Sequence, residues 1–209
     1  MKIQSGQTLL MIGDSITDVG RDRPVGEKQG IGSGYVRDVW AQLGANHPDC
    51  KISVLNTGIS GNRVTDLEAR WQEDVLDHSP DWVSVMIGIN DVWRHFDSPM
   101  IDQVDIEMYE LKLDGLIQKT LPAVKGMILM TPYFLETNLS DPMRKQMDMY
   151  GAVVKKLSKK HNTVFVDTQA AFDAYLDFQP TQTLCGDRVH PNEVGHMILA
   201  NVFLKAIEE

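Results

Sequence analysis

The stretch TLLMIGDSITD, residues 8–18, carries the strongest fold signal in the chain. Its first half, Thr8–Ile12, is a strand-length apolar run without polar alternation, which is typical of a strand covered on both faces of a parallel sheet. Gly13 and Asp14 end the run, and Ser15 follows directly. A serine at this point can present its hydroxyl at the sheet edge, or it can cap the next helix, because serine and aspartate both favour the N-cap position. The stretch therefore predicts a buried strand followed by a polar turn, with both roles open for Ser15.

Four further apolar runs of strand length follow along the chain, at Ile52–Leu55, Trp82–Ile87, Met127–Met130 and Val164–Val166. Between them, apolar residues recur at spacings of three and four, the period of an amphipathic helix. These helical patterns are marked by Val36, Val39, Trp40 and Leu43, by Val64, Leu67, Trp71 and Val75, by Met143, Met147, Tyr150, Val154 and Leu157, and by Val194, Met197, Ile198 and Val202. Strands alternating with helices predict right-handed crossovers and a three-layer α/β/α sandwich with a five-stranded parallel sheet. With no linker or repeat in view, residues 1–209 are expected to form a single domain.

The composition excludes several classes of function. The net charge is −9, so the chain offers no basic face for nucleic-acid phosphates. No apolar stretch approaches the ~20 residues of a membrane helix, and the N-terminal residues lack a signal-peptide pattern. We therefore expect a cytoplasmic protein in which Cys50 and Cys185 are reduced thiols. None of the 6 histidines shows a metal-ligand spacing such as His-x-x-x-His, so neither a metal nor another cofactor is expected.

Polar residues follow the predicted strands, at the sheet edge where open α/β sheets bind their ligands. Gly61 comes after the second run, in a glycine-rich turn whose backbone can approach a ligand closely. Asn90 comes after the third run, and its amide can reach developing negative charge. Asp187 lies three residues before His190, ahead of the last predicted helix. Each residue also has a simpler interpretation, namely a tight turn, an Asx-turn or a structural histidine.

These residues together supply every role that ester hydrolysis requires. The reaction needs a hydroxyl nucleophile, a base that titrates near neutral pH, an acid that orients the base, and donors for the oxyanion. Ser15, His190 and Asp187 fill the first three roles, and Gly61 and Asn90 supply donors. The sequence therefore predicts a serine ester hydrolase.

The chain resembles the SGNH hydrolases, the GDSL-type esterases, in four elements that span nearly its whole length in the family's order. These elements are Gly13-Asp14-Ser15-Ile16, Ser60-Gly61-Asn62, Gly88-Ile89-Asn90-Asp91 and Asp187-Arg188-Val189-His190. The resemblance implies a flavodoxin-like SGNH hydrolase fold and a Ser15–His190–Asp187 triad. It also implies an oxyanion hole formed by the N–H groups of Ser15 and Gly61 and the side chain of Asn90.

A narrower resemblance is to bacterial acetylxylan esterases, over Lys2–Gly20, Glu68–Arg94 and Met127–Ala171. It implies removal of acetyl groups from short acetylated xylo-oligosaccharides, or from another small acetyl ester, by a homo-oligomer inside the cell. In such relatives a bulky aromatic residue directly precedes the triad aspartate, whereas this chain has Gly186 there.

Four residues that come after predicted strands are predicted to contact the substrate: Asp14, Trp93, Arg94 and Tyr133. An aromatic ring can stack on the apolar face of a sugar, and an arginine can donate to hydroxyl groups. The alternative is that these side chains pack the bases of the loops.

Two other functions remain open from the sequence. The first is a broad short-chain carboxylesterase without a preference for sugars. The second is a non-catalytic carbohydrate-binding protein on a hydrolase scaffold, which the complete set of catalytic roles disfavours.

Overall fold

Five parallel strands form the central sheet of the computed structural model, which describes residues 1–25 and 30–208. The strands are β1 (Thr8–Gly13), β2 (Ser53–Asn56), β3 (Trp82–Met86), β4 (Gly126–Met130) and β5 (Val164–Val166). Their order across the sheet is β2-β1-β3-β4-β5, and every pair of neighbours is parallel. This is a doubly wound, flavodoxin-like order, which places a ligand crevice where the chain direction across the sheet reverses, beside β1 and β3. The predicted fold class is confirmed.

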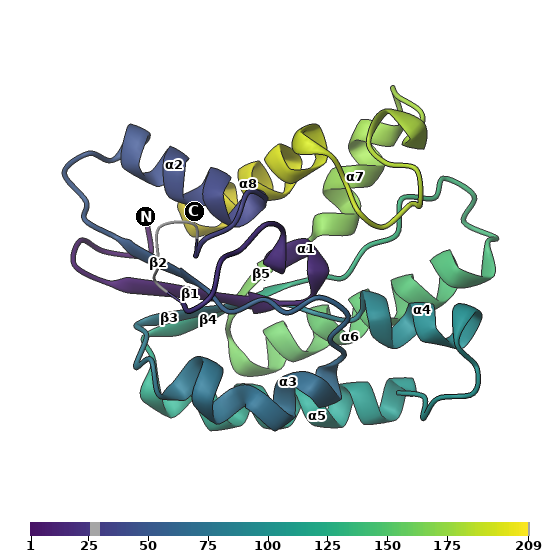
Figure 1. Ribbon diagram of the computed structural model, residues 1–209, viewed down its shortest axis with the longest axis horizontal. Coiled ribbons are helices and arrows are strands. Elements are labelled where there is room, and N and C mark those ends of the chain that lie inside the picture. The colour runs from purple at the N-terminus through teal and green to yellow at the C-terminus, as the bar shows by residue number, and fades with distance from the viewer. Residues whose placement is uncertain (26–29, 209) are drawn as a thin grey trace.

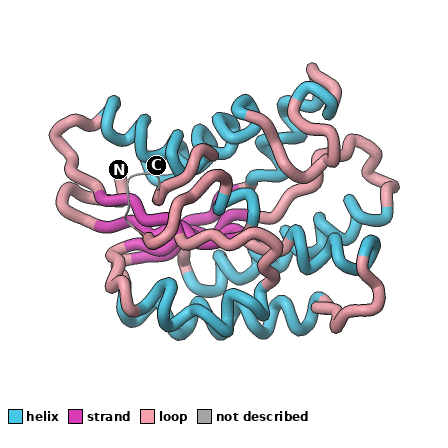
Figure 2. Tube along the Cα trace, viewed as in Figure 1, coloured by secondary structure: helices cyan, strands magenta, loops and turns pink. Residues whose placement is uncertain are grey.

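Helices cover both faces of the sheet (Figures 1 and 2). One layer holds α2 (Tyr35–Asn46), α7 (Thr168–Leu176) and α8 (Glu193–Glu208), with α8 packed against the other two. The opposite layer holds α3 (Val64–Trp71), α4 (Ile89–Asp97), α5 (Ile106–Thr120) and α6 (Pro142–His161). A one-turn helix, α1 (Ser15–Asp18), follows β1 directly. The result is the predicted three-layer sandwich.

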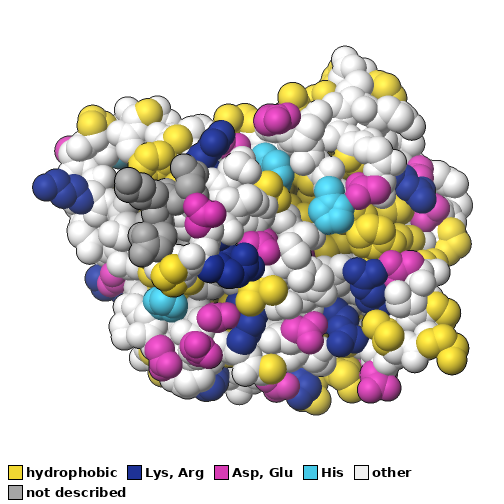
Figure 3. Space-filling view, in the orientation of Figure 1, with side chains coloured by type: hydrophobic (Ala, Val, Ile, Leu, Met, Phe, Trp, Pro, Cys, Tyr) yellow, Lys and Arg dark blue, Asp and Glu magenta, His cyan; other side chains and the backbone are white. Residues whose placement is uncertain are grey.

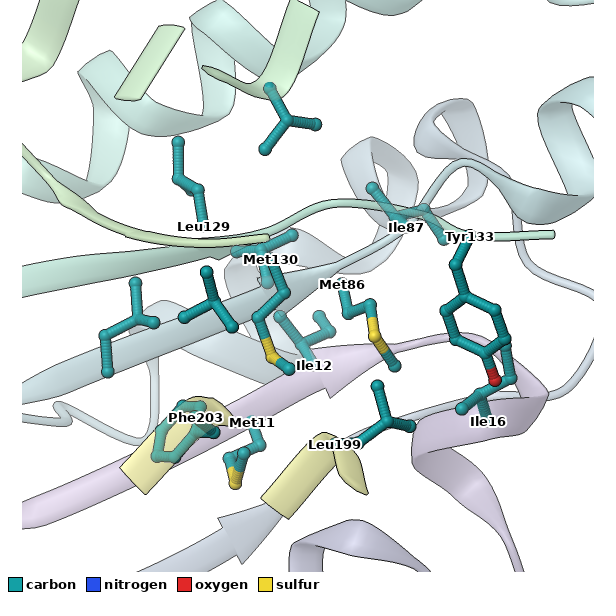
Figure 4. Close-up of a cluster of buried hydrophobic side chains, with 14 of the residues drawn as sticks. Met11, Ile12, Ile16, Met86, Ile87, Leu129, Met130, Tyr133, Leu199 and Phe203 are labelled. Atoms are coloured by element: carbon teal, nitrogen blue, oxygen red, sulfur yellow. The ribbon is translucent and has the colours of Figure 1, made fainter. Parts of the chain in front are cut away.

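The hydrophobic core lies between the sheet and its two helical layers. The strands are apolar and buried because helices cover both of their faces, as the unalternated runs require. Figure 4 draws part of this core, with side chains from β1, β3, β4 and α8. Each large apolar side chain buried in this way stabilises the fold by about 1.5–3 kcal/mol. The core thus fixes the strand ends from which the polar turns extend.

The structure differs from the sequence prediction in its helices. The pattern through Val75 predicts one continuous helix, but α3 ends at Trp71 and a π-helical segment, Gln72–Leu76, follows. The sequence analysis also does not mark α5, although Tyr109, Leu113 and Leu116 form its buried face. Met108 and Leu111 are exposed apolar residues that interrupt its polar face, and Gly115 lowers its helix propensity. The 3.6-residue period of this helix is therefore hard to recognise in the sequence.

The turn after β1 depends on a glycine. A Cβ at Gly13 would lie 2.4 Å from the Met86 carbonyl oxygen of β3 and 2.4 Å from Thr17 Oγ1. Such contacts are too short for any side chain, so only glycine lets the chain turn this close to the neighbouring strand. The turn brings Ser15 to the carboxyl edge of the sheet, between β1 and β3.

Candidate active site

Ser15, His190 and Asp187 form a continuous chain of hydrogen bonds. Ser15 Oγ lies 2.9 Å from His190 Nε2, and His190 Nδ1 lies 2.6 Å from Asp187 Oδ2. Ser15 begins α1, whereas the other two residues lie in the loop between α7 and α8. The sheet thereby brings together residues that the sequence separates by 175 positions. The arrangement gives a hydroxyl a base, and gives that base a carboxylate partner.

Backbone donors in its own loop hold the Asp187 carboxylate in place. Its second oxygen, Oδ1, accepts hydrogen bonds from the N–H groups of Val189 and His190, each at 2.9 Å. Burial raises the pKa of Asp187, but the hydrogen bonds from the His190 ring and from the two N–H groups outweigh burial and hold that pKa below its ordinary value. Asp187 is therefore ionised at neutral pH and fixes the orientation of the imidazole.

The three predicted oxyanion donors, Ser15, Gly61 and Asn90, lie in the segments that follow β1, β2 and β3. The N–H groups of Ser15 and Gly61 form no hydrogen bond with any residue that the structure describes. Gly61 has a φ of +83°, a conformation that glycine adopts without strain. Asn90 is buried, and its Nδ2 donates one hydrogen to the Asn62 carbonyl oxygen at 3.1 Å, which leaves the second hydrogen available. The three predicted oxyanion donors therefore retain free N–H bonds.

Arg70 ties the turns that carry these donors to one another. From α3, its guanidinium donates to the Gly13 and Thr57 carbonyl oxygens at 3.2 and 2.6 Å and to Asn62 Oδ1 at 2.7 Å. Its fourth partner is Asp74, at 2.6 Å. The Asn62 carbonyl oxygen also accepts a hydrogen bond from Asn90 Nδ2. Through Asn62, Arg70 therefore connects the end of β1 with a predicted oxyanion donor. The sequence analysis missed this residue, which looks like an ordinary member of a helical i,i+4 ion pair.

Asp18 stabilises the same region from α1. Its carboxylate accepts hydrogen bonds from the Ser60 N–H at 3.0 Å and the Ser60 hydroxyl at 2.9 Å, and it lies 3.5 Å from Arg21 Nε. Arg21 in turn donates twice to the Gly58 carbonyl oxygen. These contacts fix the turn that presents the Gly61 N–H.

Asp14 does not face the substrate, so its predicted role in substrate binding is wrong. The residue is 1% exposed, and its Oδ1 accepts the Ile16 N–H at 3.0 Å as the N-cap of α1. Its Oδ2 has no hydrogen-bond partner among the described residues. Burial raises the pKa of Asp14 to about 7, and the Ile16 N–H and His190 oppose that rise only in part. Burial therefore disfavours the charged form of this carboxyl, and its negative charge is reduced near neutral pH.

Tyr133 is also placed wrongly by the sequence prediction. Its side chain is fully buried, its hydroxyl donates to the Val189 carbonyl oxygen at 3.1 Å, and its ring packs on Phe172 with centroids 4.4 Å apart. Figure 4 shows Tyr133 among the core side chains. The Tyr133 side chain therefore packs at the base of the loop that carries His190 and does not reach solvent.

Trp93 and Arg94 lie beside the triad, as predicted for residues that follow β3. The Trp93 ring centroid lies 5.9 Å from that of His190. Arg94 lies over the Trp93 ring at 5.4 Å, donates to Asn90 Oδ1 at 3.2 Å and forms an ion pair with Asp97. Both residues are partly exposed. Trp93 and Arg94 therefore present an aromatic ring and a guanidinium on the same side of the site as His190.

Three further observations concern surface charge, metal binding and membrane-spanning helices. On the face drawn in Figure 3, Lys and Arg side chains are interspersed with Asp and Glu. Within residues 1–25 and 30–208, no group of three or more His, Cys, Asp and Glu side chains is arranged to hold a metal ion. Over the same residues, no helix is both long enough and apolar enough to cross a membrane.

Comparison with known proteins places the chain among ester hydrolases. The acetylxylan esterase of Geobacillus stearothermophilus is 54% identical over 211 residues, which cover 99% of this chain and 96% of that protein. A solved structure of an acetyl-xylooligosaccharide esterase from Geobacillus has a TM-score of 0.98, covering 100% of this chain and 97% of that one. An alpha/beta hydrolase enzyme from the metagenome of Lake Arreo, Spain, is 47% identical with a TM-score of 0.96, covering 100% and 98%.

Solved variants of the Geobacillus enzyme bear on individual positions. Three are described as catalytic mutants, in which a serine, an aspartate or a histidine is replaced by alanine. Another replaces the tryptophan that directly precedes that aspartate, whereas this chain has Gly186 directly before Asp187. Residues 11–198 match the GDSL-like lipase/acylhydrolase family. With this match and the 54% identity over nearly its full length, the chain belongs to the GDSL-like lipase/acylhydrolase family.

Proposed function

We propose that this protein is a serine esterase that removes acetyl groups from acetylated xylo-oligosaccharides. The observation that carries the proposal is the hydrogen-bonded chain from Ser15 Oγ through His190 to Asp187. The substrate class is supported by the 54% identity to an acetylxylan esterase over nearly the full chain.

The reaction begins at the Ser15 hydroxyl. His190 Nε2 takes the proton as Ser15 Oγ attacks the acetyl carbonyl carbon, and the carbonyl oxygen becomes an oxyanion. The Asp187 carboxylate stabilises the imidazolium that forms. His190 then donates the proton to the sugar oxygen, which leaves as an alcohol and gives an acetyl-enzyme. Water is deprotonated by His190, attacks the acetyl-enzyme and releases acetate, and Ser15 regains its proton.

The oxyanion is stabilised by donors that are already in place. In this proposal, the N–H groups of Ser15 and Gly61 and the free Nδ2 hydrogen of Asn90 donate hydrogen bonds to the oxyanion. Removing one such donor typically costs 10²–10³ in kcat, about 3–4 kcal/mol. The contacts of Asn62 and Arg70 keep the Asn90 amide oriented before substrate arrives.

The sugar is recognised beside His190. Trp93 offers a ring for the apolar face of a sugar, and Arg94 offers donors for its hydroxyl groups. These two residues are the proposed substrate-binding side chains on this side of the site.

The first experiment measures acetate release from acetylated xylo-oligosaccharides, with the Ser15→Ala variant as the blank. Release by the native protein alone supports both the nucleophile and the sugar substrate. If the folded native protein releases no acetate from the sugars but hydrolyses aryl acetates, the sugar assignment fails and the broad short-chain carboxylesterase takes its place. That alternative is favoured by the exposure of the triad, since the side chains of His190 and Asp187 are 45% and 43% exposed.

The proposal also covers the domain organisation, cellular location and oligomeric state of the protein. A single continuous hydrophobic core supports one domain over residues 1–209. The free thiols Cys50 and Cys185 support a reducing, cytoplasmic location, which fractionation of cells would test. Large exposed apolar side chains such as Trp40, Met100 and Phe178 support a homo-oligomer, which light scattering would test.

A further inference from the structure

Asn90 makes two hydrogen bonds that fix the orientation of its side-chain amide. The residue lies in the first turn of α4 and is 3% exposed. Its Nδ2 donates to the Asn62 carbonyl oxygen at 3.1 Å, and its Oδ1 accepts a hydrogen bond from Arg94 Nη2 at 3.2 Å. A flipped amide would set an N–H group against the guanidinium and an oxygen against a carbonyl oxygen. Both contacts therefore favour the same orientation, with the amide N–H groups on the side of Asn62.

Arg94 holds the amide oxygen from the same helix. It follows Asn90 by four residues, a spacing that places the two side chains on one face of α4. The guanidinium is also held by an ion pair with Asp97 and by the Trp93 ring, whose centroid lies 5.4 Å from Arg94 Cζ. Because the Arg94 side chain is 26% exposed, water screens its charge only in part. The guanidinium is thus fixed against the amide oxygen.

The contact at Oδ1 also affects the nitrogen at the other end of the amide. A hydrogen bond from a charged donor is stronger than a neutral one, and linked hydrogen bonds polarise one another, so the amide N–H groups become better donors. The acetyl oxygen gains its negative charge only during the reaction. A stronger donor at Nδ2 therefore raises kcat and has little effect on the binding of the uncharged ester.

We infer that Arg94 is a positioning residue for ester hydrolysis, which orients and polarises the Asn90 amide toward the oxyanion through its contact with Oδ1. The inference rests on the proposed function, and it gives Arg94 a role that requires no sugar. A guanidinium has five N–H donors, so the contacts with Asn90 and Asp97 leave donors for the sugar hydroxyl groups proposed above.

The first test is the Arg94→Met variant, assayed on 4-nitrophenyl acetate with Ser15→Ala as the blank. This substrate carries no sugar, so a loss of sugar contacts cannot change its rate. We expect kcat to fall about tenfold, less than the 10²–10³ for removing the Asn90 donor itself, while KM changes less than about twofold. Arg94→Lys keeps a positive donor at the same spacing and should restore kcat to within about threefold of the native value.

A double variant shows whether Arg94 acts through the amide. In an Asn90→Ala background, the group that Arg94 orients is absent, so adding Arg94→Met should lower kcat less than about twofold further. Arg37→Met is the matched control. It removes the same charge from an exposed position of α2, in the opposite helical layer, and should match the native protein in kcat and KM.

NMR of the side-chain amides reports the same contact without turnover. The two Nδ2–H resonances of Asn90 in ¹⁵N-labelled protein are assigned by their absence from the spectrum of Asn90→Ala. They should shift in Arg94→Met, return toward their native positions in Arg94→Lys, and stay unchanged in Arg37→Met.

Two kinetic results would overturn the inference. The first is a native kcat for 4-nitrophenyl acetate in Arg94→Met, even if KM for acetylated sugars rises. The second is a loss of kcat that is equally large in the Asn90→Ala background. If the native protein hydrolyses aryl acetates but releases acetate from no sugar, only the sugar assignment fails, because these assays use no sugar. If it hydrolyses no ester, the proposed function fails, and unchanged Asn90 resonances in Arg94→Met would then refute the orienting contact as well.

Discussion

Replacing Arg70 by methionine would remove the guanidinium that joins the turns of the active site. Methionine keeps an unbranched, flexible stem of similar reach, so packing along α3 is largely retained. What is lost are the hydrogen bonds to the Gly13 and Thr57 carbonyl oxygens and to Asn62 Oδ1, and the ion pair with Asp74. Gly13 and Thr57 are buried, so their carbonyl oxygens would be left without a donor from this side chain.

The size of the effect follows from these contacts. The Arg70 side chain is 14% exposed, and removing one partner of such a largely buried charged network costs about 3–5 kcal/mol. A chain of this length loses roughly 2–4 °C of melting temperature per kcal/mol, so the midpoint should fall by about 10 °C. The kcat for 4-nitrophenyl acetate should fall about tenfold, less than the 10²–10³ for deleting a donor, because Asn90 keeps its amide but loses its firm support.

Urea unfolding followed by tryptophan fluorescence would measure the free energy of unfolding, and initial rates would give kcat and KM. The control is Lys112→Met, which breaks the surface ion pair with Glu68 and should cost at most about 1 kcal/mol with no change in kcat. If Arg70→Met and Lys112→Met were equally stable, the proposed link between the turns would be wrong.

Three further predictions concern single side chains. Asn90→Ala should fold normally and lose 10²–10³ in kcat, and an unchanged kcat for aryl acetates would remove it from the oxyanion site. His196 Nδ1 accepts a hydrogen bond from the Tyr35 N–H, and burial lowers the pKa of His196 to about 4. As pH falls from 6.5 to 4, the unfolded chain therefore takes up a proton at His196 before the folded protein does. The free energy of unfolding of the native protein, measured with urea, should fall by up to about 3 kcal/mol relative to that of His196→Asn over this range. Burial raises the pKa of Asp14 to about 7, so between pH 4 and pH 7 the folded protein holds a proton that the unfolded chain has released. As pH rises from 4 to 7, the free energy of unfolding of Asp14→Asn should therefore increase by up to about 4 kcal/mol relative to the native protein. A difference that does not change with pH would show that Asp14 is ionised in the fold.

Local sequence patterns predict most of the fold, because each strand is decided by its own residues. All five predicted strands agree with the observed ones to within one residue at each end; the second, for example, begins at Ser53 instead of Ile52. The site follows from topology, since parallel strands end at one edge and bring Ser15 and Asn90 together there.

The errors arise where the environment of a side chain decides its role. Asp14 and Tyr133 each follow a strand, as a substrate-binding residue would, but they point beneath the site and are buried. Arg70 donates to the backbone carbonyl oxygens of Gly13 and Thr57, in two different turns, and backbone acceptors leave no signature in the sequence. Such contacts depend on tertiary packing, which no single stretch of sequence encodes.

The separation of 175 positions between Ser15 and His190 has a consequence for synthesis. The serine leaves the ribosome long before its base is made, so a nascent or truncated polypeptide that lacks His190 carries an unactivated hydroxyl. Ester turnover therefore begins only when the last loop has docked on a finished sheet. A fluorogenic acetate added during translation or refolding would report the completion of the fold in real time, with a lag that fluorescence of the early strands would not share.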